Sequence, residues 1–224
     1  MKINYMLSPS SLNLFLDCPR CFWLYVKRRI SRPEGPVSTL PRGMDGLIKK
    51  HFDKYRKFGR LPPELEGRVT AKPIQQVLLD KWRDWRSGLR HEEEGVSLVG
   101  ALDECFVEGE LYIPVDYKTR GYELKEDTAS YYQNQLNIYA FLLEKNGYKV
   151  STFAYLVFYV LESLSDNGQA RFKIQLIKVE TDTKKAYQIF KEAAKLLDKD
   201  TPPQKNLRCN FCAWAVNNLS FKPH

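Results

Sequence analysis

One stretch, Val99 to Arg120, constrains the fold of this chain more than any other; it reads VGALDECFVEGELYIPVDYKTR. It predicts two strands, Leu98–Val107 and Leu111–Lys118, because both segments are rich in residues that favour β-structure. Gly109 and Glu110 separate them, and a two-residue loop that begins with glycine is typical of a type II′ hairpin turn. We therefore expect a β-hairpin at the centre of the fold.

The register of this hairpin decides which side chains meet. A two-residue loop places Asp103 directly opposite Asp116, and cross-strand neighbours share a face with their Cβ atoms roughly 5 Å apart. Lys118 lies on the same face as Asp116, because side chains alternate along a strand. One face then gathers two carboxylates and an amine, whereas a longer loop would place the partners diagonally.

This acidic face has two interpretations. Carboxylates this close repel each other unless a positive charge lies between them, and Mg²⁺ prefers such hard oxygen ligands. Lys118 could then orient a water molecule or stabilise a developing negative charge. The alternative is an exposed hairpin with an ordinary Asp–Lys ion pair, because the tripeptide D-x-K is common.

Size and charge narrow the class of protein. The chain has 224 residues, 43% of them hydrophobic, which suits a globular core and argues against disorder. Its formal net charge of +8 favours a polyanionic partner. We find no segment that resembles a signal peptide and none with the roughly 20 apolar residues of a membrane span. The expectation is a cytoplasmic protein without a membrane partner.

Four of the five cysteines form two C-x2-C pairs, Cys18 with Cys21 and Cys209 with Cys212. In a reducing compartment such pairs indicate a metal site more than disulfides. Four thiolates suit a tetrahedral zinc ion or an iron–sulfur cluster, and this site would join the two ends of the chain. The alternative is four unrelated core cysteines, as we expect for Cys105.

Capping residues and periodicity predict the remaining elements. Ser8 and Pro9 open a first helix, and Thr181 with Asp182 caps the last. Between them we expect helices at residues 45–58, 71–87 and 131–146 and strands at Thr152–Leu161 and Arg171–Val179. This order predicts a mixed α/β fold around a sheet of four or more strands, in a single domain of residues 1–224. Within it, residues 8–32 and 200–224 are expected to form the cysteine-ligated subdomain.

Two polar side chains mark the helix expected at 131–146. Gln135 and Tyr139 lie four residues apart and therefore share one surface of that helix. Both can form hydrogen bonds, although the helix is otherwise apolar. Taken alone, they are also what an ordinary Tyr–Gln pair on an amphipathic helix would look like.

Together these motifs resemble the PD-(D/E)XK nuclease superfamily, in its branch of RecB-like and CRISPR-associated exonucleases. The resemblance rests on five segments in family order: SPSSLNLFLDCPRCFWL, GALDE, VDYKT, YYQNQLNIYAF and CNFC. Each segment is weak alone, and together they span almost the whole chain. The fold that this resemblance implies is restriction-endonuclease-like, with a mixed sheet flanked by helices.

The resemblance also implies roles for individual residues. Asp103 and Asp116 would hold Mg²⁺ or Mn²⁺, with the backbone carbonyl of Tyr117 as a further ligand. Lys118 would position the attacking water. Gln135 and Tyr139, from the Q-x3-Y segment, would steady the site or the DNA strand.

The chain departs from the family pattern in two places. The family's early helix usually offers a histidine ligand, whereas here Leu47 stands where it is expected; Asp45 is the preferred substitute, and His51 is second. Relatives with an iron–sulfur cluster typically use one N-terminal and three C-terminal cysteines, whereas this chain has two and two. The resemblance favours a [4Fe–4S] cluster at these cysteines, with Zn²⁺ as the alternative.

The function that this resemblance implies is a metal-dependent DNA nuclease that hydrolyses phosphodiester bonds. It would act as an exonuclease on single strands or DNA ends. DNA repair and CRISPR adaptation are the expected settings, with a helicase or a CRISPR integrase as the expected partner. The alternative is a non-catalytic DNA-binding or scaffold subunit that retains the nuclease fold. Asp103, Asp116 and Lys118 are all present, which argues against that alternative because degeneration usually removes one of them.

Overall fold

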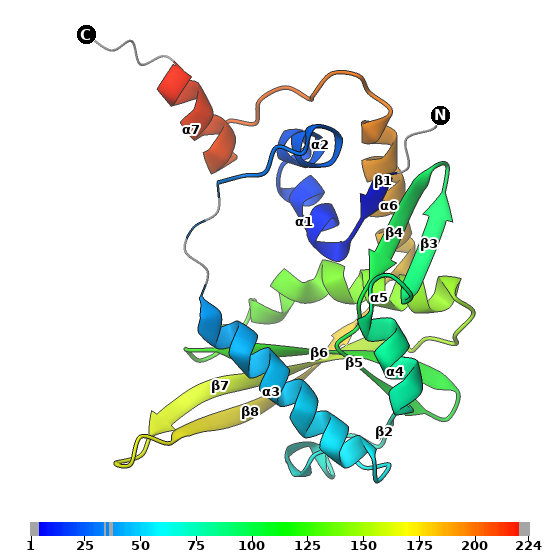
Figure 1. Ribbon diagram of the computed structural model, residues 1–224, viewed down its shortest axis with the longest axis vertical. Coiled ribbons are helices and arrows are strands. Elements are labelled where there is room, and N and C mark those ends of the chain that lie inside the picture. Colours follow the sequence, from blue (N-terminus) through cyan, green and yellow to red (C-terminus); the bar gives the residue numbers. More distant parts are fainter. Residues whose placement is uncertain (1–4, 34, 36–37, 220–224) are drawn as a thin grey trace. The chain divides into compact units, whose positions relative to one another are not determined.

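The computed structural model describes residues 5–33, 35 and 38–219 (Figure 1). The chain divides into two compact units, and each is described by itself. The first unit comprises the described parts of Met1–Val37, Glu92–Leu98 and Tyr187–His224, and the second comprises Ser38–His91 and Val99–Ala186. Within the described residues, none of the helices has the length and apolar character needed to cross a bilayer.

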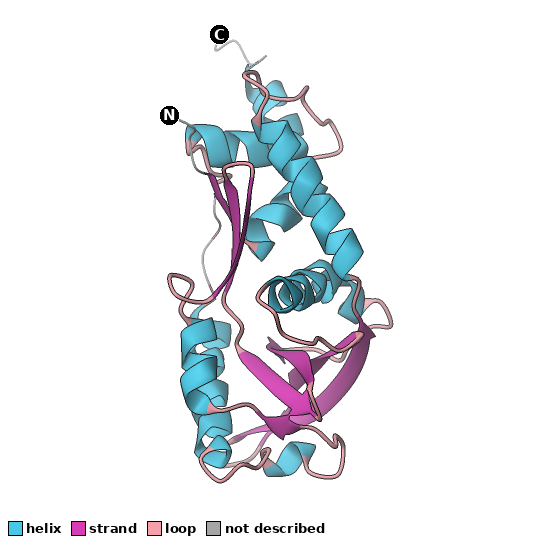
Figure 2. Cartoon of the chain, turned by 90° about the vertical axis from the view of Figure 1, so that its right-hand side faces the viewer, coloured by secondary structure: helices cyan, strands magenta, loops and turns pink. Residues whose placement is uncertain are grey.

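A five-stranded sheet forms the centre of the second unit (Figure 2). Its order is β2 (Lys72–Pro73), β5 (Glu104–Glu108), β6 (Leu111–Arg120), β7 (Phe153–Leu164) and β8 (Ala170–Glu180). The pairs are antiparallel except β6 with β7, which are parallel. A parallel pair needs a crossover, and the segment that contains α5 (Gln133–Lys145) provides it.

The pairing of β5 with β6 confirms the predicted two-residue loop. Glu108 pairs with Leu111 and Glu104 with Val115, which is the predicted register. Gly109 has a φ of +60°, a backbone conformation that glycine adopts without steric cost. Asp103 forms a bend immediately before β5, outside the paired residues, so its position opposite Asp116 stays a prediction.

The prediction of one strand over Leu98–Val107 is wrong. The segment forms two strands, β4 (Val96–Gly100) and β5, separated by a break at residues 101–103. β4 belongs to a second sheet, in which β1 (Tyr5–Leu7), β4 and β3 (Leu89–Glu93) lie in that order. Gly100, Ala101 and Asp103 are residue types that strands disfavour, so the sequence carries a signal for this interruption that the prediction overlooked.

Each face of the five-stranded sheet packs against one helix (Figure 1). On one face, Ile48 and Phe52 of α3 (Thr39–Arg56) join a buried cluster with Phe106, Ile113, Val115, Tyr117, Val157 and Tyr159. On the other face, Leu136 of α5 joins Ala154, Leu156, Phe158, Val160 and Val179. Burying a side chain the size of Phe52 or Leu136 contributes roughly 1.5–3 kcal/mol. The predicted mixed sheet with flanking helices is confirmed.

Two predicted helices differ in extent from the structure. The helix expected at 71–87 is only α4 (Gln76–Arg83), because Lys72 and Pro73 pair with β5 as the edge strand β2. The helix expected at 45–58 begins earlier, as α3 from Thr39. Two short 3-10 helices complete this unit, Pro63–Leu65 and Thr128–Tyr132.

The first unit contains α1 (Pro9–Asp17), α2 (Pro19–Arg28), most of α6 (Thr183–Leu197) and α7 (Asn210–Leu219). Ser8 caps α1 as predicted: its Oγ accepts a hydrogen bond from Ser11 N, while Ser8 N donates to Ser11 Oγ at 2.8 Å. α7 is not among the predicted elements, because the second cysteine pair by itself indicates only a tight turn.

Gly100 generates a prediction about packing between β4 and α5. A Cβ at this position would stand 2.5 Å from Leu142 Cδ1, and Leu142 is fully buried, so the methyl group cannot fit without repacking. We expect Gly100→Ala to lower the free energy of unfolding by about 1–3 kcal/mol, measured by urea denaturation. Gly121→Ala is the matched control, since nothing lies within 4 Å of its added Cβ. Equal stability of the two variants would contradict the packing described here.

Candidate active site and cysteine site

Strand β6 and helix α5 bring four of the predicted site residues together. The Asp116 carboxylate has one oxygen, Oδ2, 2.6 Å from Lys118 Nζ, while the other, Oδ1, accepts a hydrogen bond from Gln135 Nε2 at 3.1 Å. Gln135 Nε2 also donates to the Tyr139 hydroxyl at 2.8 Å. The D-x-K and Q-x3-Y segments therefore form one connected set on the α5 face of the sheet.

Asp116 is a buried acid in a negative environment. Burial raises its pKa to about 6; the Lys118 ammonium opposes that shift, and the carboxylates of Asp103 and Asp45 add to it. Its Oδ2 is buried and has the Lys118 ammonium as its cationic neighbour, at 2.6 Å. A buried carboxylate with further acids nearby and one ammonium to balance them suits a divalent cation.

Asp103 lies at the start of β5 and is held by a residue that the sequence analysis missed. Lys49, on α3, places its Nζ 2.7 Å from Asp103 Oδ1 and 2.9 Å from Asp45 Oδ2. Burial acts to lower the pKa of Lys49, but the two carboxylates outweigh it and raise that pKa, which keeps the ammonium charged. The available signal was the spacing of Asp45 and Lys49, four residues apart on the predicted helix.

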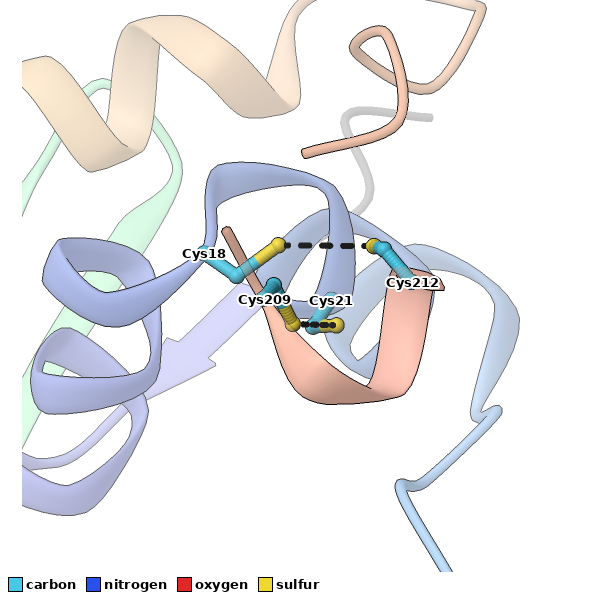
Figure 3. A group of neighbouring side chains, drawn as sticks. All are labelled: Cys18, Cys21, Cys209 and Cys212. Atoms are coloured by element: carbon cyan, nitrogen blue, oxygen red, sulfur yellow. Dashed lines mark hydrogen bonds between the residues drawn. The ribbon is translucent and has the colours of Figure 1, made fainter. Parts of the chain in front are cut away.

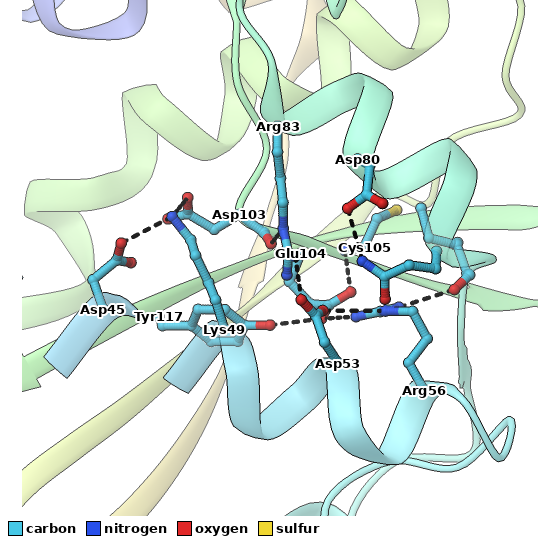
Figure 4. Close-up of polar contacts among 12 residues, drawn as sticks. Asp45, Lys49, Asp53, Arg56, Asp80, Arg83, Asp103, Glu104, Cys105 and Tyr117 are labelled. Carbon is cyan, nitrogen blue, oxygen red and sulfur yellow. Dashed lines mark hydrogen bonds and ion pairs between the residues drawn. The ribbon is translucent and has the colours of Figure 1, made fainter. Parts of the chain in front are cut away.

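A buried ion pair lies on the opposite face of the hairpin (Figure 4). Glu104, which is fully buried, pairs with the buried guanidinium of Arg56 and accepts a hydrogen bond from the Tyr117 hydroxyl at 2.6 Å. Arg56 also donates to the carbonyl of Ile74 at 2.9 Å. Burial raises the pKa of Glu104, while Arg56 and the Tyr117 hydroxyl act to lower it. The neighbours of Asp103 and Asp116 in the chain are thus fixed by polar contacts of their own.

Arg83 extends this network to the acidic site. Its Nε donates to the backbone carbonyl of Asp103 at 3.0 Å, and its NH1 lies 2.7 Å from Asp53 Oδ2 (Figure 4). α4 therefore restrains the break between β4 and β5 from which the Asp103 side chain projects. No periodic pattern in the sequence predicts these contacts.

His51 contacts Glu64 rather than the aspartates of the candidate metal site. Its Nε2 is 3.0 Å from Glu64 Oε1, and Glu64 also accepts a hydrogen bond from the Tyr159 hydroxyl at 2.7 Å. Asp45, by contrast, reaches Asp103 through Lys49. The structure therefore connects Asp45 to the acidic cluster and His51 to Glu64.

The four paired cysteines meet at one point in the first unit (Figure 3). Their Sγ atoms all lie within 4.8 Å of one another, with 3.7 Å between Cys18 and Cys212 and 3.8 Å between Cys21 and Cys209. All four are buried and free of disulfides. In the described part of the chain, no other three histidine, cysteine or acidic side chains come close enough to share an ion in this way. The prediction that this site joins the two ends of the chain is confirmed.

Side chains of α2 bring the second cysteine pair to the first. Arg20 donates to the carbonyl of Pro203 at 2.7 Å, Trp23 to that of Lys199 at 3.0 Å, and Lys27 to that of Leu197 at 2.8 Å. These bonds satisfy carbonyls at the end of α6 and in the segment after it, which have no helical partners. The segment that leads to Cys209 is therefore tied to the helix that carries Cys21.

Each cysteine pair begins a helix, which favours thiolates. Cys18 precedes α2 and Cys209 precedes α7, where unpaired backbone N–H groups attract negative charge. Burial acts to raise the pKa of Cys209, but N–H groups of Cys212 and Phe211 lower it to about 7. Burial raises the pKa of Cys21 to about 12, so a bound cation is needed to keep all four sulfurs ionised.

The spacing of the sulfurs tests which metal fits. Around one tetrahedral zinc ion with Zn–S bonds of about 2.3 Å, sulfurs lie about 3.8 Å apart. The contacts of 3.7 and 3.8 Å match this value. A [4Fe–4S] cluster places its iron atoms between the sulfurs and needs them farther apart. These two of the six sulfur separations suit a single zinc ion, and all six lie within 4.8 Å.

The cysteine site generates a prediction about metal content. Protein purified anaerobically should be colourless and carry one zinc ion per chain by elemental analysis, because the sulfur spacing suits a single ion. Cys209→Ser should lose most of that zinc, whereas Cys105→Ser, at a buried cysteine outside the group, should keep it. A brown protein with about four irons per chain would contradict the single-ion geometry.

Asp116 generates a prediction about pH. Because the pKa of this acid is raised from 3.8 to about 6 in the folded chain, its protonated form favours folding. That contribution is complete below about pH 4 and is lost as pH rises through 6, a change of roughly 3 kcal/mol. In buffer without Mg²⁺ or Mn²⁺, the melting temperature of Asp116→Asn should therefore rise relative to that of wild type as the pH increases from 4 to 7.5. Asp166→Asn, at an exposed turn, should show no such gain, and a pH-independent difference for Asp116→Asn would refute the assignment.

Comparison with known proteins places the chain in a family. A model of the PD-(D/E)XK nuclease superfamily matches residues 49–216, which is more than half of the chain and includes Asp103, Asp116, Lys118 and the second cysteine pair. No curated protein matches closely enough to be counted as a relative. Because of this match and because it has a mixed sheet with flanking helices, the chain belongs to the PD-(D/E)XK nuclease superfamily.

Proposed function

We propose that this protein is a Mg²⁺- or Mn²⁺-dependent deoxyribonuclease that hydrolyses phosphodiester bonds. Members of its superfamily are generally metal-dependent nucleases. The observation that carries the proposal is the buried Asp116 carboxylate, which has Lys118 Nζ 2.6 Å from its Oδ2 and the negative charges of Asp103 and Asp45 close enough to raise its pKa. The register of β5 and β6, which pairs Glu104 with Val115, supports the predicted pairing of Asp103 with this acid one residue further along.

The proposed ligands are oxygen atoms on and beside the hairpin. Asp103 and Asp116 bind the ion, with the backbone carbonyl of Tyr117 as a third ligand. Asp45, preferred over His51, is the candidate fourth ligand, and its use depends on Lys49, which it contacts at 2.9 Å. All of these are hard oxygen donors, as Mg²⁺ and Mn²⁺ require.

When bound, the ion polarises the phosphate, lowers the pKa of its water and stabilises the leaving oxygen. The chain's own residues then position the reacting groups and compensate their negative charge. Lys118 is a donor beside the acid, able to orient the attacking water or to stabilise negative charge on the phosphate. Gln135 fixes the Asp116 carboxylate at 3.1 Å, and its bond to Tyr139 holds that amide in place. The ring of Tyr132, 4.7 Å from Lys118 Nζ, limits where the ammonium can move.

The finer assignment concerns substrate and setting. We propose exonuclease action on single strands or DNA ends, in DNA repair or CRISPR adaptation, with a helicase or integrase as partner. The net charge of +8 supports a nucleic-acid substrate, and the RecB-like sequence segments support the exonuclease branch. Four thiols that act as metal ligands need a reducing compartment, which supports the cytoplasm.

The direct test is cleavage of labelled single- and double-stranded DNA in the presence of Mn²⁺. We expect wild type to cleave and Lys118→Ala to lose about 10²–10³-fold in rate, a loss typical for removal of one charge-stabilising group. Both proteins should still bind DNA. Lys173→Ala is the matched control, because Lys173 is also a strand lysine in an ion pair, with Glu123 at 3.0 Å. A wild-type protein that binds DNA but cleaves neither substrate would support the scaffold alternative instead.

A further inference from the structure

Lys49 bridges two of the acids near the proposed metal site. Its Nζ lies 2.7 Å from Asp103 Oδ1 and 2.9 Å from Asp45 Oδ2, and the three residues adjoin in Figure 4. The Lys49 side chain is 28% exposed, so the ammonium is partly shielded from water. The contact with Asp103 joins the middle of α3 to the start of β5.

This contact is more than a helix-surface ion pair. Spacing of four residues explains why Lys49 meets Asp45, a pairing that stabilises a helix by only about 0.2–0.5 kcal/mol. It does not explain the shorter contact with Asp103, on another element. The two nearby arginines contact other groups: Arg56 pairs with Glu104, and Arg83 reaches the backbone carbonyl of Asp103. Among the described residues, Lys49 is thus the only cation found in an ion pair with the Asp103 carboxylate.

The acids are thereby divided into two positions. On one side of Asp103, an ammonium lies between its Oδ1 and Asp45. Asp116, whose pKa the charge of Asp103 helps to raise, has a different ammonium beside it, that of Lys118 at 2.6 Å from Oδ2. In enzymes that use two metal ions, a pair of cations about 3.5–4 Å apart is held by shared carboxylates. Here one of the two cation positions is filled by the protein itself.

We infer that Lys49 is a built-in cation that takes the place of a second divalent ion, so that the site binds one Mg²⁺ or Mn²⁺ between Asp103 and Asp116. The inference rests on the proposed function, since it assumes that these two acids bind metal. Lys49 acts through Asp103 and is therefore a positioning residue. It orients that carboxylate and compensates the charge of Asp45.

The test counts ions without measuring cleavage. Protein loaded with zinc at its cysteines is titrated with Mn²⁺, and free Mn²⁺ is followed by electron paramagnetic resonance. We expect one Mn²⁺ per wild-type chain and two per Lys49→Gln chain, with the broadened signal of neighbouring ions. Lys49→Arg keeps the charge and should bind one. Lys191→Gln is the matched control, because Lys191 also bridges two carboxylates, Glu93 and Glu94, at 2.8 and 3.3 Å.

The outcomes separate this inference from the nuclease proposal. Two ions in wild type, or one ion in both wild type and Lys49→Gln, would overturn the role of Lys49 and leave the nuclease proposal standing. No Mn²⁺ bound by wild type would overturn the metal-dependent function itself. If circular dichroism shows that Lys49→Gln does not fold, Lys49→Met, which removes the charge from a side chain of similar length, takes its place in the same count.

Discussion

The pairing of β5 with β6 is the constraint on which the rest of the site depends. Its two-residue loop fixes parity: Asp116 and Lys118 contact Gln135 of α5, while Glu104 and Tyr117 lie on the α3 face. A slip of one residue would exchange the two sets, putting Asp116 against Phe52 and Tyr117 beside Gln135. Because both faces are covered by helices, the hydrophobic clusters and the polar groups specify the same register.

The two faces of the hairpin treat charge in opposite ways. On the α3 face, Glu104 has Arg56 and the Tyr117 hydroxyl as partners, so a fully buried acid is satisfied inside the protein. Breaking such a pair typically costs 3–5 kcal/mol, which makes it a firm anchor for the hairpin. On the α5 face, Asp116 is equally buried, its Oδ2 contacts the Lys118 ammonium at 2.6 Å, and burial with two neighbouring acids raises its pKa to about 6. The chain thus combines a closed polar network with a buried acid in a negative environment, and groups of this kind concentrate at functional sites.

Features that depend on a few adjacent residues, such as turns, helix caps and paired cysteines, were predicted from the sequence. The hairpin register followed from Gly109, the start of α1 from Ser8, and the joining of the chain ends from the two cysteine pairs. The break between β4 and β5 was missed because the sheet that each half joins is a long-range choice, even though Gly100, Ala101 and Asp103 are poor strand formers. Lys49 and the Arg56–Glu104 pair were missed for the same reason, since each joins α3 to β5 across about fifty residues of sequence. The spacing of sulfurs that separates zinc from a cluster is a property of three-dimensional geometry alone.

The most direct test of this account is anomalous diffraction from crystals of the protein soaked in Mn²⁺. The account predicts a manganese peak about 2.0–2.3 Å from a carboxylate oxygen of Asp103 and from one of Asp116, on the α5 face of the sheet. A peak bound by neither acid, or carboxylates that point to opposite faces of the sheet, would contradict the central claim that these two strands present one shared cation site.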